Sequence, residues 1–259
     1  MISISLLLLA ANPAPFQEPA ATAAPQQEPS ASARFEALKA EYDEAYQAWM
    51  TKVQALFAEA EASGEPLTEY PPQPGADFVP RFAEAAAEFA GTDGAVPFLV
   101  WIVQNGLYQQ MPEAKDALGK LMSTHIASEE LAPLGPMLPQ LDYVMGEGYA
   151  AKMAAKLEKE SKSPNMRAWA AYTRLAPVFK NNGPKTDAFL GAKKEMLALL
   201  EKVDDPYLQM TFDSEVTVLE VFGIGMTAPD ITGPDLDGTT FSLTDYKGKV
   251  IFLDFWGDW

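Results

Sequence analysis

The strongest structural signal in the chain is its end, Lys249-Val250-Ile251-Phe252-Leu253-Asp254-Phe255-Trp256-Gly257-Asp258-Trp259. From Val250 to Trp256 the sequence is apolar apart from one carboxylate and is rich in residues that favour strands. It is too short to span a membrane, so it predicts a strand covered on both faces in the middle of a sheet. Nothing follows that could cover it, and each large side chain left uncovered would cost about 1.5–3 kcal/mol. We therefore expect the sequence to be a fragment that is cut inside its second domain.

Three motifs precede this strand. Ala228-Pro229-Asp230 begins an extended segment, because the residue before a proline avoids the helical region. Asp237-Gly238 lies between the short runs 231–236 and 239–243 and predicts a β-hairpin with a two-residue turn. Tyr246-Lys247-Gly248 predicts the turn that leads into the buried strand.

The four elements together resemble the opening of a redoxin domain. They are Gly225-Met226-Thr227-Ala228-Pro229-Asp230, Leu236-Asp237-Gly238, Ser242-Leu243-Thr244-Asp245-Tyr246-Lys247-Gly248-Lys249 and Leu253-Asp254-Phe255-Trp256-Gly257-Asp258-Trp259. The family comprises the TlpA/ResA thiol-disulfide reductases, which have a thioredoxin-like fold, and the related AhpC/TSA peroxiredoxins with their antioxidant activity. In the reductases a Cys-x-x-Cys redox centre follows the Phe-Trp-x-x-Trp motif. The ending at Trp259 favours the reductase branch, because peroxiredoxins usually carry a Pro-Thr-containing run before their peroxidatic cysteine.

This resemblance assigns roles to the last residues. Asp254 matches the acid that lies beneath the redox cysteines and would act as the general base. A carboxylate inside an apolar strand is expensive to bury, so we expect a raised pKa; the alternative is an acid at the strand end that reaches water. The neighbouring positions would flank the active centre. Trp256 and Trp259 would shield the dithiol, and the negative charge of Asp258 would disfavour the thiolate of the first cysteine. These flanking residues are Phe255, Trp256, Gly257, Asp258 and Trp259.

The chain contains no cysteine and one histidine, His125. Without cysteine there is no disulfide, thiolate metal site or cysteine nucleophile within these residues, so we expect the fragment itself to be inactive. His125 has no second histidine to pair with, and we expect a satisfied helix-surface or core histidine. Asp230, Asp235 and Asp237 lack the spacing of a calcium loop and are expected to serve turns. We predict no metal and no organic cofactor.

Charge and composition restrict the partners. The 259 residues are 48% hydrophobic and 21% charged, an ordinary globular balance. The formal net charge of -17 argues against nucleic acid or an anionic membrane as a partner, because both require clustered Lys and Arg. The resemblance to the reductases implies client protein disulfides and a reducing partner as the partners, and a membrane would be involved only through a possible signal sequence.

The amino end predicts export. Residues 1–11 contain an apolar run with the length of a signal-peptide h-region that ends in small residues, although no Lys or Arg precedes it. Residues 12–33 are rich in Pro, Ala and Gln and predict a linker that cannot bury enough apolar surface to fold. We expect a bacterial protein exported to the periplasm or cell envelope; the alternative is a disordered cytosolic tail.

Residues 34–210 predict a mainly α domain of stacked helical hairpins. Apolar residues such as Phe35, Leu38 and Tyr42 recur at three- and four-residue steps, and short Gly/Pro loops separate the periodic runs. No repeat motif recurs clearly enough to identify a tetratricopeptide-like solenoid. Residues 211–222 predict a connector, either a short strand or a linking helix, before the redoxin segment 223–259. The predicted helices are 35–63, 77–91, 95–106 (possibly a strand instead), 113–125, 128–134, 140–161, 164–180 and 186–203.

The predicted fold is thus a helical domain followed by the first hairpin and first central strand of an incomplete α/β thioredoxin-like domain. The predicted function is that of an exported thiol-disulfide oxidoreductase whose redox cysteines follow Trp259. Two alternatives stay open: a peroxiredoxin-like hydroperoxide reductase, and a helical-repeat interaction scaffold with an inactive redoxin domain. Two cysteines, one or none after Trp259 would distinguish the three.

Overall fold

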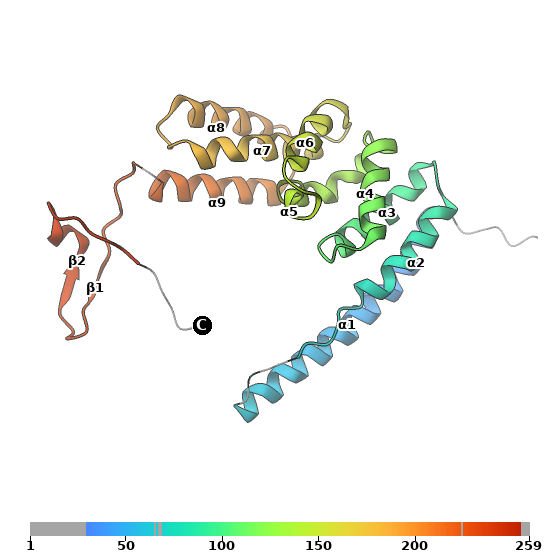
Figure 1. Cartoon of the computed structure of the whole chain (residues 1–259), viewed down its shortest axis with the longest axis horizontal. Coiled ribbons are helices and arrows are strands. Elements are labelled where there is room, and N and C mark those ends of the chain that lie inside the picture. The colour runs from blue at the N-terminus through green and yellow to red at the C-terminus, as the bar shows by residue number, and fades with distance from the viewer. Residues whose placement is uncertain (1–29, 65, 67–68, 224, 255–259) are drawn as a thin grey trace, which may run out of the picture.

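The computed structural model describes residues 30–254 apart from 65, 67, 68 and 224. In these ranges a succession of helices leads to a short hairpin, which confirms the predicted mainly α body followed by the hairpin of a partial thioredoxin-like domain (Figure 1). The predicted signal region 1–11 and residues 12–29 of the predicted linker lie outside the described residues. Within the described ranges, none of the helices is both long and apolar enough to cross a membrane.

Helix α1 (Ala31–Ser63) begins inside the segment that composition assigned to the linker 12–33. The Ser30 side chain caps the helix by accepting a hydrogen bond from the amide of Ala33 at 3.2 Å. Gly64 ends it in the left-handed conformation, at φ 72°. The predicted apolar stripe is confirmed, because Phe35 and Tyr42 make edge-to-face contacts with aromatic rings of the next helices.

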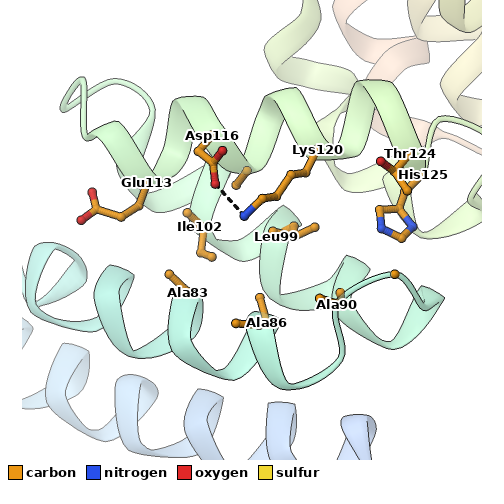
Figure 2. Close-up of a pocket in the computed structure, with 14 residues that line it drawn as sticks. Ala83, Ala86, Ala90, Leu99, Ile102, Glu113, Asp116, Lys120, Thr124 and His125 are labelled. Atoms are coloured by element: carbon orange, nitrogen blue, oxygen red, sulfur yellow. Dashed lines mark ion pairs between the residues drawn. The ribbon is translucent and has the colours of Figure 1, made fainter.

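Helices α2 (Gly75–Glu88), α3 (Val96–Gly106) and α4 (Pro112–Thr124) form two successive antiparallel hairpins, so α2 and α4 run in the same direction (Figure 2). The short 3₁₀ helix η1 (Asp93–Ala95) joins α2 to α3. As its apolar sequence predicted, α3 is a helix buried on nearly all sides, and not a strand. The predicted N-cap of α2, Asp77, lies instead in the first turn, because Pro74 occupies the cap position.

The middle of the chain departs most from the predicted helices 128–134 and 140–161. After the predicted start at Ser128, a long 3₁₀ helix, η2 (Glu129–Gln140), forms instead of a short α-helix. Three residues per turn place side chains at every third position on the same side, which suits the regular spacing of its prolines, Pro133, Pro136 and Pro139. Gly146 and Gly148 adopt positive φ and divide the second predicted helix into α5 (Asp142–Met145) and α6 (Tyr149–Glu160).

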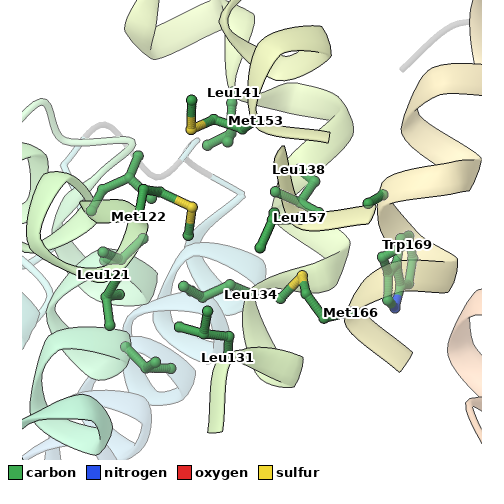
Figure 3. Close-up of a cluster of buried hydrophobic side chains, with 14 of the residues drawn as sticks. Leu121, Met122, Leu131, Leu134, Leu138, Leu141, Met153, Leu157, Met166 and Trp169 are labelled. Atoms are coloured by element: carbon green, nitrogen blue, oxygen red, sulfur yellow. The ribbon is translucent and has the colours of Figure 1, made fainter. Parts of the chain in front are cut away.

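The 3₁₀ helix η2 lies in the core, where it packs against α3, α6 and α7 (Pro164–Asn181). Figure 3 shows its leucines Leu131, Leu134 and Leu138 among apolar side chains of α4, α6 and α7. Gly135 is buried against Trp169 of α7, and a Cβ added at Gly135 would lie 2.2 Å from the indole Cδ1. The contact between η2 and α7 therefore depends on the absence of a side chain at residue 135.

The helical body continues through α8 (Asp187–Leu200) to α9 (Pro206–Phe222). Residues 211–222, for which a short strand or a linking helix was predicted, form most of α9. Phe212 and Val216 are buried and α9 packs on α7, so the helical body extends to residue 222 and not only to 210. Asp205 begins this helix: its Oδ1 accepts from the amide of Leu208 at 2.9 Å, and its Oδ2 accepts from Trp169 Nε1 at 2.8 Å.

Beyond the helical body, the strands β1 (Thr232–Pro234) and β2 (Thr240–Ser242) pair in antiparallel fashion, with Thr232 opposite Ser242. The short 3₁₀ helix η3 (Leu243–Tyr246) follows directly. The predicted hairpin is confirmed, but its loop is longer than the two residues predicted. The amide of Asp235 donates to the carbonyl of Thr239 at 2.8 Å, which leaves residues 236–238 as the loop. Gly238 has φ 81°, the left-handed conformation that three-residue loops require at their end.

Candidate functional site

The carboxylate of Asp235 shapes the hairpin loop of the redoxin-like segment. Its Oδ1 accepts hydrogen bonds from the amide of Asp237 at 2.9 Å and from the amide of Thr239 at 2.8 Å. An Asp side chain that accepts a hydrogen bond from the backbone amide two residues further on stabilises a turn. Asp235 therefore has the turn role that the sequence predicted for it.

A second carboxylate, that of Asp230 in the Ala-Pro-Asp motif, joins the start of this segment to η3. Its Oδ1 accepts from the amide of Thr244 at 3.0 Å, and its Oδ2 accepts from the hydroxyl of Thr244 at 2.9 Å. Ser242 and Asp245 form a capping box on η3, in which the Ser242 amide donates to Asp245 Oδ2 at 2.8 Å. The polar residues of the redoxin-like motifs thus position the backbone of the segment.

The apolar side chains of the same segment are largely uncovered. Leu236, Val250 and Phe252 are almost wholly exposed. Phe241 and Tyr246 make an edge-to-face contact, with their ring centres 6.1 Å apart, yet both remain exposed. The segment therefore gains little stability from burial of its apolar side chains.

The structure differs from the prediction at the candidate catalytic residues. Val250–Asp254 forms no strand, because no segment of the described chain pairs with its backbone. Asp254 is exposed, so the burial on which its predicted role as a general base depends is not found. Phe255, Trp256, Gly257, Asp258 and Trp259 lie outside the described residues, and their roles stay predictions.

Gly223 lies where the helical body meets this segment. Its amide closes the last turn of α9 by donating to the carbonyl oxygen of Leu219 at 2.8 Å. A Cβ at residue 223 would lie 2.2 Å from the same oxygen, far inside van der Waals contact. The direction in which the chain leaves α9 therefore depends on a residue without a side chain.

The last helix is also fixed to α7 by a partly buried polar pair. The hydroxyl of Tyr172 donates to Glu215 Oε2 at 2.6 Å. Burial, and next this hydrogen bond to a negative group, raise the pKa of the Tyr172 phenol well above its usual value. The pair holds α9, and with it the start of the redoxin-like segment, against the helical body.

A groove in the helical body is a second candidate site, and the sequence-based predictions did not include it. It lies between α2 and α4 over α3 and has a cavity volume of about 340 Å³ (Figure 2). Three alanines of α2 line one side, Ala83, Ala86 and Ala87, together with Ala90 just beyond the end of the helix. Their spacing places them on one face of a helix, and this stripe of small residues is the sequence signal that could have indicated the groove.

Polar side chains lie along the α4 side of this groove. Glu113 lies near one end, and Asp116 forms an ion pair with Lys120 at 2.7 Å. His125 lines the other end; its side chain is only 7% exposed, and its Nδ1 lies 3.4 Å from Asp93 Oδ1. No group of three or more His, Cys, Asp or Glu residues in the described part of the chain could hold a metal ion. The groove thus combines an apolar lining with one charged side.

Comparisons with known proteins concern a short part of the chain. No family model and no solved structure matches this chain. Curated relatives named thiol-disulfide oxidoreductase ResA do match. The protein from Geobacillus thermodenitrificans is 56% identical over 36 residues, which cover 14% of this chain and 21% of the relative. The one from Geobacillus kaustophilus is 53% identical over 36 residues with the same shares, and the one from Bacillus anthracis 48% identical over 40 residues, or 15% and 23%.

The matches are thus strong in identity but short in length. The chain spans only 21–23% of the length of these curated relatives. The matched length is close to that of residues 225–259, whose motifs resemble a redoxin domain and whose described part forms the hairpin and η3. The similarity supports a thioredoxin-like family for a short segment of this chain and a function related to thiol-disulfide oxidoreductases.

Proposed function

We propose that this chain belongs to a thiol-disulfide oxidoreductase in which a helical body precedes a redoxin domain of the TlpA/ResA kind. The observation that carries the proposal is the identity of 56% over 36 residues to ResA of Geobacillus thermodenitrificans. The hairpin supports it, because polar residues of the redoxin-like motifs hold its backbone in place: Asp230 accepts from Thr244, and Ser242 and Asp245 form the capping box of η3.

The proposed reaction is dithiol-disulfide exchange with a client protein. The thiolate of the first of two cysteines, placed in the proposal after Trp259, attacks one sulfur of the client disulfide. The S–S bond breaks, and the other client sulfur leaves as a thiolate that takes a proton. The second cysteine thiolate then attacks the mixed disulfide, so that the client leaves with two thiols and the enzyme retains a disulfide. A separate reducing partner returns the enzyme to its dithiol form.

The residues before the proposed cysteines have supporting roles. Asp254 accepts the proton of the second, buried thiol, and the indoles of Trp256 and Trp259 shield the dithiol from water. Asp258 adds negative charge beside the first cysteine and makes the couple more reducing. The exposed side chains of Val250 and Phe252 support this assignment, because they offer the apolar faces that other strands and helices of a redoxin sheet would cover.

The proposal also includes export to the bacterial periplasm or cell envelope. It rests on the apolar run in residues 1–11 and on the linker-like composition of residues 12–29. A disulfide reductase needs clients with disulfides, and these form and persist in such oxidising compartments.

The first experiment reads the coding sequence beyond the codon for Trp259 and assays the protein that the whole reading frame encodes. We expect Cys-x-x-Cys there, and catalysed reduction of insulin by dithiothreitol. One cysteine with peroxidase activity would support the peroxiredoxin-like alternative. A frame without cysteine, or a Cys-x-x-Cys protein that does not reduce insulin, would contradict the proposal.

Substitution of the acid tests its proposed role in the same assay. Asp254→Asn should lower the rate about tenfold or more at neutral pH, since a positioned general base contributes at least that much. Asp237→Asn, in the exposed hairpin loop, is the matched control and should leave the rate unchanged. Equal rates for the two variants would exclude Asp254 as the base.

A further inference from the structure

Another groove of the helical body runs between α7 and α9 and continues to η2 and α5. Its part along α9 has a volume of about 630 Å³, and its part beside η2 has a volume of about 230 Å³. The two parts adjoin, because Tyr172, Lys180, Tyr207 and Thr211 line both of them. Figure 1 shows α5 and α7 beside the start of α9, where these parts meet. We call this surface the α7–α9 groove.

Aromatic and proline side chains form the end of this groove beside η2. Pro136 and Pro139 of η2 line it together with Tyr143, Trp169 and Tyr207. Tyr143 is 85% exposed and Tyr207 is 54% exposed, so both rings still offer apolar surface. Grooves lined by aromatic side chains are the surfaces on which proline-rich segments bind in the polyproline II conformation.

The free polar groups of the groove can donate hydrogen bonds. The ammonium of Lys180 forms no ion pair or hydrogen bond within the described residues. The hydroxyls of Tyr143 and Tyr207 have no hydrogen-bond partner there either. Glu215, the one carboxylate among the described lining residues, already accepts from the Tyr172 hydroxyl at 2.6 Å. The groove therefore suits a ligand that offers hydrogen-bond acceptors and a negative charge.

The chain itself contains a segment of matching chemistry, residues 12–29, which lie outside the described residues. Five of these residues are prolines, which favour the polyproline II conformation, and in that conformation the backbone carbonyls form no internal hydrogen bonds. The two charged residues of the segment, Glu18 and Glu28, are both negative, and Phe16 is its one large apolar residue. Residues 13–19 combine three of the prolines with Phe16 and Glu18, so this part complements the groove best.

The segment is long enough to reach the groove. The start of α1 lies against the start of α3, where the ring centres of Phe35 and Phe98 are 5.3 Å apart. From there α3 advances about 9 Å to Gln104, whose side chain donates to the carbonyl of Pro133 at 3.1 Å. The 3₁₀ helix η2 then advances about 14 Å to its end at the groove. Residues 17–29 in polyproline II conformation span about 40 Å, well beyond these two advances together.

We propose that residues 13–19 bind the α7–α9 groove of the same chain in the polyproline II conformation. The rings of the two exposed tyrosines hold the prolines, and their hydroxyls donate to backbone carbonyls of the segment. The ammonium of Lys180 pairs with the carboxylate of Glu18, and Phe16 enters the part of the groove along α9. This contact attaches the amino end of the chain beside the helix that leads into the redoxin-like segment, and it does not depend on the proposed redox function.

Cross-linking of the purified chain tests the proposal, because the chain contains no cysteine and an engineered pair of thiols reacts alone. The variant Gln17→Cys/Ser214→Cys places one thiol in the segment and one on the groove, and bismaleimidoethane joins thiols that lie close together. We expect a cross-link within one chain, with a yield that does not change when the protein is diluted. Gel electrophoresis and intact-protein mass spectrometry measure the yield. A cross-linked dimer as the main product would show that the segment binds a second copy and would overturn the proposal.

The matched control keeps both cysteines and the length of chain between them. In this variant Pro13, Pro15, Phe16 and Pro19 are also replaced by serine, which removes their rings but leaves the tether unchanged. The cross-link yield should fall at least about fivefold, because the segment can no longer bury apolar surface in the groove. Equal yields with and without the serines would show that chance encounters along the tether produce the cross-link, and would refute the proposal.

Charge reversal tests the proposed ion pair in the same cross-linking assay. Lys180→Glu should lower the yield about two- to fivefold at low salt, the effect of an exposed ion pair. Lys152→Glu, at an exposed position of α6 outside the groove, is the control and should leave the yield unchanged. Circular dichroism verifies that both variants are folded. Equal yields for the two variants would exclude the pair of Lys180 with Glu18, and with it the proposed orientation of the segment.

Discussion

The helical body and the redoxin-like segment contain similar kinds of residue but are held together by different forces. Phe82 in α2 is fully buried and stacks on Trp101, with ring centres 3.7 Å apart, whereas Phe252 is 91% exposed. The segment is ordered by hydrogen bonds among its own residues, such as those from Thr244 to Asp230. Local hydrogen bonds can therefore set the shape of a segment, but the free energy of folding comes from burial, and burial is concentrated in the body.

The largest effect on stability should come from replacing a phenylalanine by alanine in the helical body, and the same replacement in the redoxin-like segment is its control. Phe82→Ala removes a fully buried ring and should lower the free energy of unfolding by about 3–5 kcal/mol. Phe252→Ala should change it by less than about 0.5 kcal/mol, because its ring is already in water. Urea unfolding followed by far-UV circular dichroism measures both. A comparable loss for the two variants would contradict the division between body and segment.

Glycine 135 offers a sharper test of close packing in the body. Gly135→Ala places a methyl group against the indole of Trp169 and should cost about 2–3 kcal/mol of unfolding free energy. The control is Gly191→Ala on the exposed side of α8, where an added Cβ meets nothing within 4 Å. That change should stabilise the protein by about 0.5–1 kcal/mol, since alanine favours helix. We expect the unfolding free energy to fall for Gly135→Ala and to rise for Gly191→Ala. A loss of stability in both variants would disprove the packing argument.

A smaller effect is expected at the acid that joins α7 to α9. Asp205→Ala removes the cap of α9 and leaves the indole N–H of Trp169 without its acceptor, which should cost about 2 kcal/mol. Asp205→Asn retains one acceptor oxygen and should cost less. Chemical denaturation distinguishes the variants, and identical midpoints for Ala and Asn would show that neither hydrogen bond contributes measurably.

The smallest effect on stability is expected at Tyr172, and it should depend on pH. Its pKa is raised by burial and by Glu215 above the value of about 10 expected in the unfolded chain. Stability from this group is therefore fully present below pH 10 and is lost as the pH rises further, because the unfolded chain then releases the proton more readily than the folded one. Tyr172→Phe should cost about 1 kcal/mol near pH 7.

The pH dependence of this variant provides the check. Between pH 9 and pH 11, the unfolding free energy of the parent chain should fall more steeply than that of Tyr172→Phe, so that their difference narrows. The other tyrosines with raised pKa values, Tyr42, Tyr108 and Tyr149, are present in both proteins and cancel. A difference that widens above pH 10 would have the wrong sign for a buried phenol bound to a carboxylate.

Local sequence signals were sufficient for most of the helices. Ser163-Pro164 at the start of α7 and Gly64 at the end of α1 are strong boundary signals, and the structure follows both. The same signals were present before α9, where Asp205 precedes Pro206 and apolar residues follow at helical spacing. These signals mark the start of α9, but the apolar spacing is less regular in residues 211–222, and that part of the helix was therefore predicted as a connector.

Other features depend on packing that no local pattern contains. The prolines of η2 indicated a break in the helix, but a long 3₁₀ helix forms because its leucines and Gly135 fit between α3, α6 and α7. The groove between α2 and α4 likewise depends on two parallel helices that are not consecutive in the sequence, since α3 lies between them. Sequence periodicity shows which face of a helix is small or apolar, but it does not show what lies opposite.

For the candidate redox site, the sequence predicted the hairpin correctly, but the residues after it do not form the buried strand that was predicted. The Asp-Gly turn is encoded within a few residues, so β1 and β2 form from local information. A strand at Val250–Asp254 requires partners on both sides, and none is present among the described residues. The exposure of Asp254 follows from the same lack of neighbours.

The enclosure of Trp169 has an optical consequence. Its indole lies between Gly135 and the carboxylate of Asp205, shielded from water, whereas an indole in a flexible or hydrated position emits at longer wavelength. A red shift of its emission would signal that η2, α7 and α9 have separated, even while most of the helical signal persists. The protein therefore carries an intrinsic fluorophore at the junction that holds its second half together.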